Sequence, residues 1–314
     1  MARLRGRALA CVAALFAAIW VSAAAPVPEN ADSYVLLDVG ALLESDLFAR
    51  FTEVWGGKVV FVDLLRTEAA RLGVDIEELA PDIAAVINWK QLERTVIAAE
   101  FSRPIRGAVM TAALAQPELF KVDEAGAIRA RFDINEGKVG KEPLFYEIRF
   151  VRDDLAVGGE STAVAGYLAD IQAGVKAVEG TGAVARCVLR LPAKTGSQAA
   201  DLLIGGIGAV DANIFAGEGG GARLESTWHG ADSRELRQRL GMVWNFGAGL
   251  LFGRDKALAD RLKGLPAIRN RGAGVVEFTV TLGTEEIDRM LAILQESIRK
   301  DSVYFVNTNE EEGW

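Results

Sequence analysis

Several short stretches of the chain alternate between apolar residues and polar or charged ones, as half-buried β-strands do. The alternation is clearest in residues 128–134 and 144–151, where each stretch has one apolar and one charged face. Turn residues follow both stretches, at 135–137 and at Asp153-Asp154. This pattern predicts an antiparallel sheet that is covered by helices on one face and is in contact with water on the other.

Other segments repeat apolar residues every three or four positions, which predicts helices between the strands. We expect amphipathic helices at 42–55, at 59–72, after Pro104, from Ser161, at 197–210, from Asp232 or Ser233, and from Thr284. Asp75 and Glu78 form a capping box for one more short helix. The remaining strands are expected at 33–39, 94–101, 184–191, 222–229 and 275–282.

The order of these elements, strand, helix, strand pair and helix, recurs in the second part of the chain. We therefore predict an α+β protein of two related α/β sandwich halves, with mostly antiparallel sheets covered by helices on one face. The segment Glu179-Gly180-Thr181-Gly182 is the expected joint. The halves then comprise residues 25–180 and 181–300, followed by an acidic tail at 301–314 that we expect to be flexible.

The first 24 residues have the pattern of a secretory signal peptide. Arginines precede an apolar run from Ala8 to Val21, and small residues follow as far as Ala25. Cleavage is expected after Ala24, which predicts export by the general secretory route to the periplasm or the extracellular space. The alternative is an uncleaved segment that anchors the protein in the inner membrane, although the run is short for a span of about 20 residues.

The overall charge restricts the class of partner. The formal net charge is −8 at pH 7, and an acidic surface argues against nucleic acid and against anionic lipid. We expect an envelope protein as the partner. Contact with a membrane is expected only if the signal segment is not cleaved.

Three segments of the chain resemble, in their order and pattern, a loose group of exported bacterial proteins of unknown function. They read ENADSYVLLDVGALLESDLF (29–48), RLGVDIEELAPDIAAVI (71–87) and LFYEIRFVRDDLAVGGESTAVAGYL (144–168). The resemblance implies export and an α/β pattern in which an opening strand ends in aspartate and a hairpin ending in valine-glycine leads into a long helix. It implies no activity and no catalytic residues.

Histidine and cysteine are too scarce for most metal centres. His229 is the only histidine, which excludes sites with several histidine ligands, and we expect it to be solvated at a strand end. Cys187 is the only cysteine after cleavage, so no internal disulfide can form. Alternation places it on an apolar strand face, where it is expected to be a small buried hydrophobe. We expect no metal and no cofactor.

The glycine-rich run from Gly205 to Gly221 lacks the residues of a phosphate-binding loop. Such a loop needs a lysine followed by serine or threonine, or a Gly-x-Gly-x-x-Gly turn between a strand and a helix. Neither pattern is present here. We therefore expect a flexible connection.

Carboxylates are the remaining candidates for catalysis. Asp38 is a weak candidate because it ends an otherwise apolar strand, although a residue there also caps the following helix readily. The adjacent or near-adjacent acidic pairs are all explained by turns or helix starts: Glu44/Asp46, Glu77/Glu78, Asp153/Asp154 and Glu285/Glu286.

The charged strand faces offer a candidate binding surface. Arg129, Arg131 and Asp133 are expected to stand opposite Glu147 and Arg149, where opposite charges across strands stabilise a sheet. The same groups also suit a polar docking surface. The sequence thus favours an exported protein with a non-catalytic binding or scaffold role in the cell envelope. The alternatives are a carboxylate-dependent hydrolase without a recognisable motif and a periplasmic domain anchored in the inner membrane.

Overall fold

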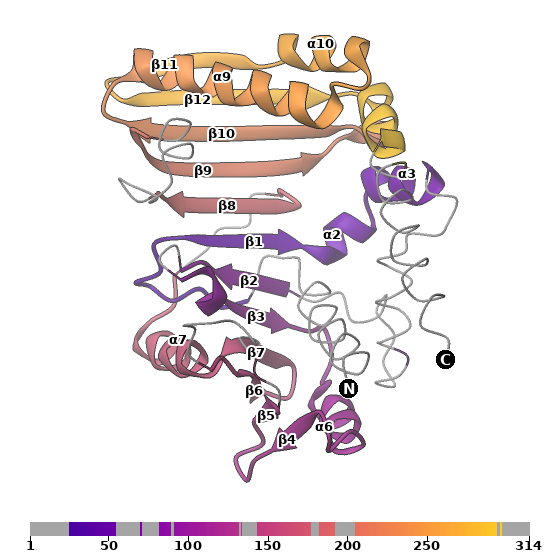
Figure 1. The fold of residues 1–314 in the computed structure, drawn as a ribbon, viewed down its shortest axis with the longest axis vertical. Coiled ribbons are helices and arrows are strands. Elements are labelled where there is room, and N and C mark those ends of the chain that lie inside the picture. Colours follow the sequence, from indigo (N-terminus) through magenta and orange to yellow (C-terminus); the bar gives the residue numbers. More distant parts are fainter. Residues whose placement is uncertain are drawn as a thin grey trace, which may run out of the picture. The chain divides into compact units, whose positions relative to one another are not determined.

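The computed structural model describes residues 25–54, 70, 82–88, 91–131, 133, 143–176, 182–191, 205–293 and 296. These residues contain twelve β-strands together with α-helices and short 3₁₀ turns (Figure 1). They divide into two compact units, and the strand pairings described within each unit are antiparallel. The prediction of an α+β protein with a mostly antiparallel sheet is therefore confirmed.

The first unit includes residues up to Leu43, the described part of Val60–Pro192, and Ala209–Asn213. Its strands lie in the order β9 (Ile207–Ala216), β8 (Ala185–Arg190), β1 (Tyr34–Asp38), β2 (Asp82–Val86), β3 (Val96–Glu100), β7 (Leu155–Glu160), β6 (Tyr146–Arg152), β5 (Ile128–Ala130) and β4 (Phe120–Val122). Its helical segments are α2 (Val39–Leu43), η1 (Leu92–Arg94), α6 (Arg106–Leu114) and α7 (Ser161–Ala173). Strand β9 belongs to this unit only through residues 209–213.

Helix α7 and the segment before β1 enclose the main core of the first unit. Val164 and Tyr167 of α7 pack with Leu36 of β1 and with buried residues of β3 and β7. Val27 is fully buried in the same cluster, and its carbonyl accepts a hydrogen bond from the backbone N–H of Lys176 at 2.8 Å. Residues 25–31 therefore form part of this core.

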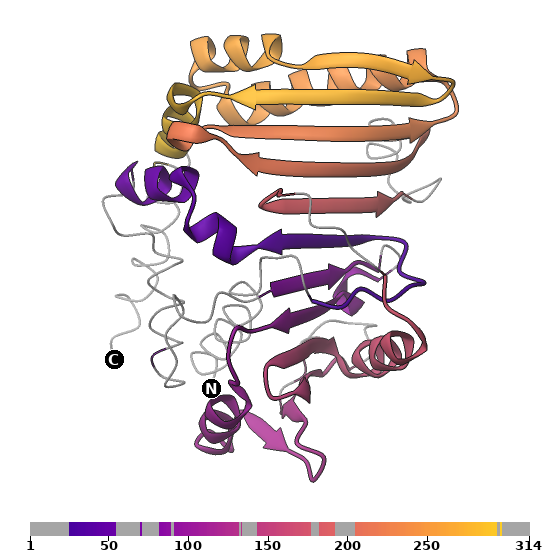
Figure 2. The ribbon, with the colours of Figure 1, turned by 180° about the vertical axis from the view of Figure 1, so that it is seen from behind.

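The second unit includes the described parts of Glu44–Val59, Ala193–Gly208 and Ile214–Trp314. Its main elements are α3 (Asp46–Val54), η2 (Glu218–Gly220), β10 (Ala222–Gly230), α9 (Ser233–Phe252), α10 (Lys256–Gly264), β11 (Ala267–Gly272), β12 (Val275–Leu282) and the helical residues 284–293. Strand β12 pairs with β10 on one side and with β11 on the other. Figures 1 and 2 show α9 lying across one face of these strands.

Helices α9 and α10 share the core of the second unit. Phe252 packs against Leu258 and Leu262, which are buried on the inner side of α10. Trp244 closes this core, since its indole N–H donates to the carbonyl of Leu262 at 2.7 Å and its ring lies 5.5 Å from that of Phe278. The predicted start of α9 is confirmed, because Asp232 caps it through the N–H groups of residues 234 and 235.

The predicted helix at 42–55 is wrong in one respect, because the chain forms two helices there. Helix α2 ends at Leu43, and α3 begins at Asp46. The hydroxyl of Ser45 accepts a hydrogen bond from the N–H of Phe48 at 3.2 Å, as a residue before a helix does. The apolar periodicity runs across the break and therefore does not reveal it.

The prediction for residues 197–210 is wrong where the structure describes them. Residues 207–210 belong to β9, and Ile207, Ala209 and Val210 are buried. The glycine-rich run is thus not a flexible connection throughout. It contains β9 and a tight turn in which the N–H of Gly217 donates to the carbonyl of Gly221 at 2.8 Å. The β-branched residues Ile207 and Val210 favour the strand.

Several other expectations fall outside the described residues. These are the leader at 1–24, nearly all of the helix at 59–72, the capping box at Asp75 and Glu78, the joint at Glu179–Thr181, and the tail at 301–314. Strand β8, which follows the expected joint, pairs with β1 in the first unit.

Glu160 provides the first testable prediction. Its carboxylate caps α7 by accepting hydrogen bonds from the N–H groups of Thr162 and Ala163 at 2.9 and 3.0 Å. Burial alone would raise the pKa of Glu160, but these backbone bonds and the nearby charge of Arg94 lower it overall. Replacing this cap with alanine is expected to cost about 1 kcal/mol of unfolding free energy.

The pH dependence of the same site has a definite sign. A lowered folded-state pKa means that the carboxylate stabilises the fold above the ordinary glutamate value, near pH about 4.3, and progressively less below it. The unfolding free energies of Glu160→Gln and the wild type, measured with urea, should therefore differ most near neutral pH and become similar in acid. A difference that is the same at pH 7 and pH 3 would contradict this account.

Candidate ligand-binding pocket

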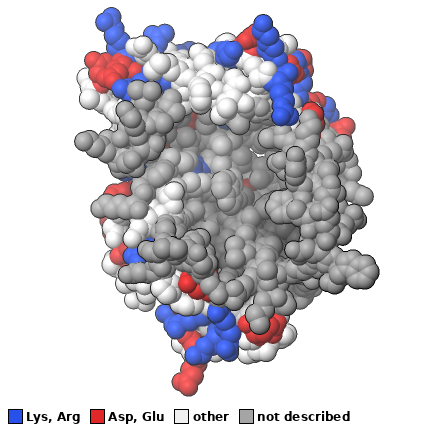
Figure 3. All heavy atoms as spheres, in the orientation of Figure 1, with Lys and Arg blue, Asp and Glu red and all other residues white. Residues whose placement is uncertain are grey.

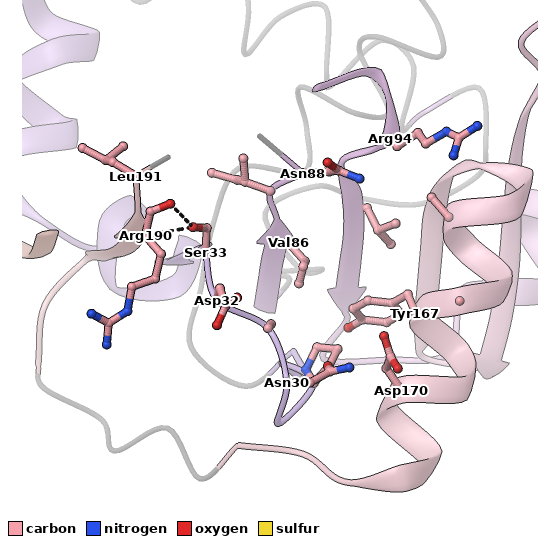
Figure 4. Close-up of a pocket in the computed structure, with 16 residues that line it drawn as sticks. Asn30, Asp32, Ser33, Val86, Asn88, Arg94, Tyr167, Asp170, Arg190 and Leu191 are labelled. Atoms are coloured by element: carbon pink, nitrogen blue, oxygen red, sulfur yellow. Dashed lines mark hydrogen bonds between the residues drawn. The ribbon is translucent and has the colours of Figure 1, made fainter. Parts of the chain in front are cut away.

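A hollow of about 500 Å³ lies in the first unit beside α7 (Figure 4). It is lined by residues from the segment before β1, the end of β2, the start of β3, α7 and the end of β8. Pockets that hold small molecules generally have volumes of about 300–1,000 Å³. The size of this hollow is therefore suitable for a small ligand.

The inner wall of the pocket is apolar. Val86 and Val96 contribute aliphatic surface from neighbouring strands, and Ala163 and Tyr167 contribute from α7. The phenol of Tyr167 donates a hydrogen bond to the carbonyl of Pro26, and burial raises its pKa. Tyr167 is therefore a neutral, fixed part of the wall and is not a base.

Gly166 keeps the pocket open on the α7 side. It lines the hollow, and a Cβ atom built on it would meet no other atom within 4 Å. A glycine within a helix costs about 0.5–1 kcal/mol relative to alanine. The absence of a side chain here leaves space in the pocket without relieving any steric conflict in the fold.

Charged side chains lie around the apolar wall of the pocket. Asp32 and Asp170 both line the pocket, and neither forms an ion pair with the described part of the chain. Figure 4 shows Asp170 beside Asn30, on the same side of Tyr167, while Arg94 lies across the pocket from them. Arg94 is 3.7 Å from the carboxylate of Glu160. The rim thus offers acceptors on one side and a cation on the other.

Ser33 fixes the strands that form one side of the pocket. Its hydroxyl accepts a hydrogen bond from the N–H of Arg190 at 2.8 Å and donates to the carbonyl of the same residue at 3.3 Å (Figure 4). Its own carbonyl accepts from the N–H of Ile87 at 2.9 Å. Ser33 therefore joins the ends of β2 and β8 at the start of β1.

A second hollow of about 440 Å³ lies in the second unit, near the glycine turn. The guanidinium of Arg223 lies 4.8 Å from the centre of the Phe215 ring and 3.3 Å from the carboxylate of Glu225. Its charge is thus already accompanied by a ring and an acid. The first hollow is lined by two carboxylates, Asp32 and Asp170, that form no ion pair with the described residues, so we place the candidate site there.

The structure places the catalytic candidate Asp38 outside this pocket. Its carboxylate accepts a hydrogen bond from the N–H of Ala41 at 2.6 Å, at the turn from β1 into α2. His229 is exposed near the end of β10. Neither residue is among those that line the candidate pocket.

The charged strand residues separate into two groups. Arg129 and Arg149 bind the carboxylate of Glu147, with Nε–oxygen distances of 2.9 and 2.6 Å, and the Glu147 side chain is 0 % exposed. Arg131 instead donates to the carbonyl of Phe120 at 3.1 Å, and Asp133 accepts from the N–H of Leu144 at 2.7 Å. Arg129 of β5 stands directly opposite Glu147 of β6, as predicted.

Sequence reasoning did not find the pocket, because its polar residues come from segments far apart in the chain. Asn30 and Asp32 precede β1, whereas Asp170 belongs to α7 and Arg190 ends β8. No spacing within any one segment indicates their proximity. The glycine at position 166, inside an otherwise regular helical stripe, was the one local signal.

Among the described residues, no group of three or more histidine, cysteine, aspartate or glutamate side chains is placed to hold a metal ion. Of the helices within the described ranges, none has the length and apolar character that crossing a membrane requires.

Comparison of the chain with known protein families, with characterised proteins and with solved structures finds no match.

The Glu147 cluster gives a stability prediction. Glu147→Gln keeps the size of the side chain but removes the charge that Arg129 and Arg149 share. Hydrogen bonds to charged groups contribute about 1.5–3 kcal/mol, so we expect a loss of about 2 kcal/mol in urea unfolding. Arg131→Gln is the matched control, since Arg131 is exposed and makes no contact with Glu147; it should change stability by less than about 0.5 kcal/mol. Equal effects of the two substitutions would contradict the structural role of Glu147.

Cys187 gives a prediction of reactivity. Burial, and to a lesser extent the negative charge of Asp211, raise the pKa of the thiol to about 11. The thiolate is the reactive form, so alkylation of the folded protein by iodoacetamide at pH 8 should be roughly 100-fold slower than that of the unfolded chain. The extent of labelling of the peptide that contains Cys187 can be followed by mass spectrometry. Equal rates in the folded and unfolded protein would show that the thiol is not shielded.

Proposed function

We propose that this protein is an exported, non-catalytic binding protein that holds a small amphipathic ligand in the pocket beside α7. The observation that carries the proposal is the open hollow of about 500 Å³ with an apolar inner wall and with Asp32 and Asp170 at its rim, neither of which forms an ion pair with the described residues. Binding pockets typically combine such apolar surface with a few polar groups that fix the orientation of the ligand.

The arrangement favours a ligand with two chemically different ends. An apolar body suits the wall of Val86, Val96 and the Tyr167 ring. A head that carries an amine or several hydroxyl groups suits the acceptors on Asp32 and Asp170. Asp32 is exposed and Asp170 is half-buried, so the oxygens of both side chains are accessible to a ligand that enters from solvent.

Export to the cell envelope remains part of this proposal and rests on the leader-like first 24 residues. An envelope protein as partner, and an uncleaved leader that holds the domain at the inner membrane, are compatible with the same pocket. The hydrolase alternative gains less support, because the carboxylate of Asp38 is engaged in capping α2. The duplication of an α/β half likewise stays a prediction, supported only by the order of the elements in the sequence.

The proposed function can be tested with a variant whose new side chain fills the pocket. Gly166→Phe places a ring in the hollow, at a helical position where glycine is not required by its backbone angle. Gly107→Phe is the matched control, because Gly107 also lies in a helix with no atom near its Cβ position but does not line the pocket. Protein exported by its native host should carry a small-molecule adduct in native mass spectrometry, and denaturing extraction would identify it.

The expected result is an adduct on the wild type and on Gly107→Phe but not on Gly166→Phe, with both variants folded by circular dichroism. An adduct that persists in Gly166→Phe would place binding elsewhere. If the wild type carries no adduct and a library of amphipathic amines and polyols raises its melting temperature no more than that of Gly166→Phe, the proposed function is wrong.

A further inference from the structure

The outer side of α9 carries an exposed apolar stripe. Met242, Phe246 and Leu250 recur every four residues, and their exposed fractions are 50 %, 58 % and 71 %. Residues four apart lie on the same side of a helix, so the stripe extends for about 12 Å along the axis. From Met242 to Gly253 no charged residue interrupts it.

The opposite side of α9 explains why this stripe is not part of the core. Leu236, Leu240 and Ala248 are buried, and Trp244 is hydrogen-bonded inward to the carbonyl of Leu262. The helix therefore has an apolar inner side that packs on the strands and a second apolar surface that the fold does not use. Single exposed apolar residues are common, but an aligned row of large ones usually marks an interaction site.

Exposed basic residues lie at both ends of the stripe. Arg234 and Arg237 are exposed near the start of α9, and Arg254 and Lys256 are exposed just beyond its end. None of these four has an ion-pair partner among the described residues, whereas nearby Arg239 is paired with Glu235. Figure 3 shows an uncharged surface in the region where Figure 1 draws α9, with both basic and acidic side chains beside it.

We propose that α9 lies in the interface of an anionic lipid membrane, with Met242, Phe246 and Leu250 inserted among the acyl chains and the flanking basic residues at the headgroups. Helices that bind in the plane of a membrane combine an apolar side with Lys and Arg at its margins. The strength of such binding increases with the apolar area that is inserted and with the electrostatic attraction to anionic lipid.

A second copy of the chain is a less suitable occupant. Antiparallel packing of two α9 helices would place Arg234 and Arg237 of one copy against Arg254 and Lys256 of the other. Parallel packing would place each basic end against itself, so both arrangements bring like charges together. Neither of the two hollows described above is lined by residues of α9.

The overall acidity of the chain does not prevent this contact. Charges are screened over about 8 Å at physiological ionic strength, so the membrane responds mainly to the groups nearest to it. Residues 232–256, which contain α9 and its flanks, have five basic and three acidic residues, although the whole chain has a net charge of −8. The expectation that anionic lipid is excluded as a partner therefore holds for the average charge and not for this surface.

Vesicle flotation of the processed chain tests the proposal. The wild type should float with vesicles of phosphatidylcholine and phosphatidylglycerol and much less with phosphatidylcholine alone. The triple substitution Met242→Gln, Phe246→Gln and Leu250→Gln should weaken binding at least about tenfold, as should the combination of Arg237→Gln, Arg254→Gln and Lys256→Gln. Since all these residues are exposed, the substitutions should not change the stability of the fold. In the absence of vesicles, the variants should therefore unfold at the same temperature as the wild type.

The control carries the same kind of change elsewhere. Leu92→Gln with Leu114→Gln alters apolar residues that are 59 % and 63 % exposed but lie outside α9, and it should leave flotation unchanged. Equal binding of the wild type and the α9 variants, or no binding to anionic vesicles, would overturn the proposal. So would a lipid-free dimer in light scattering that Phe246→Gln converts to a monomer, because a second copy would then occupy the stripe.

Discussion

The two-sided pairing of β1 is the constraint on which the first unit depends. Tyr34 stands opposite Val86 of β2 on one side and Val188 of β8 on the other, so segments about 50 and 150 residues away converge on one short strand. Backbone groups in the middle of a sheet must be hydrogen-bonded on both sides, which makes this register costly to change. The start of β1 thereby brings Ser33 to Arg190, and that junction forms one side of the pocket.

The pocket follows from this junction together with α7. Glu160 fixes the first turn of α7, Tyr167 fixes its middle against Pro26, and the N–H of Glu29 donates to the carbonyl of Gly174 at its end. The helix is thus held along its whole length, and the glycine at 166 leaves a space that the surrounding groups do not fill. A rigid frame with an unfilled, partly charged hollow lowers the entropic cost of binding a ligand there.

The sequence predicted those elements whose two faces differ. Strands β6, β10 and β12 and the start of α9 follow from alternation or capping signals. Strand β2 was missed because Ile83 and Ala84 are buried on successive positions, and β7 was missed because Gly158 and Gly159 have no side chains to show a pattern.

Glu147 was expected on a strand face in contact with water, yet two arginines cover it so that its side chain is inaccessible to solvent. This burial depends on long arginine side chains that reach Glu147 from β5 and from its own strand, and periodicity carries no information about where such side chains reach.

The net charge of the chain likewise does not predict the charge of one local surface. A net charge is a sum over the chain, and it describes how the protein behaves at distances longer than the screening length. Recognition at contact depends on the few groups within that length. At α9 the acids nearest to the apolar stripe are already engaged: Glu235 binds Arg239, and Asp255 caps α10 and binds Arg289. Asp232 caps α9 and lies near Arg234, whereas Arg237, Arg254 and Lys256 form no ion pair with the described residues. An acidic protein thus presents an apolar surface with an excess of basic groups at one helix.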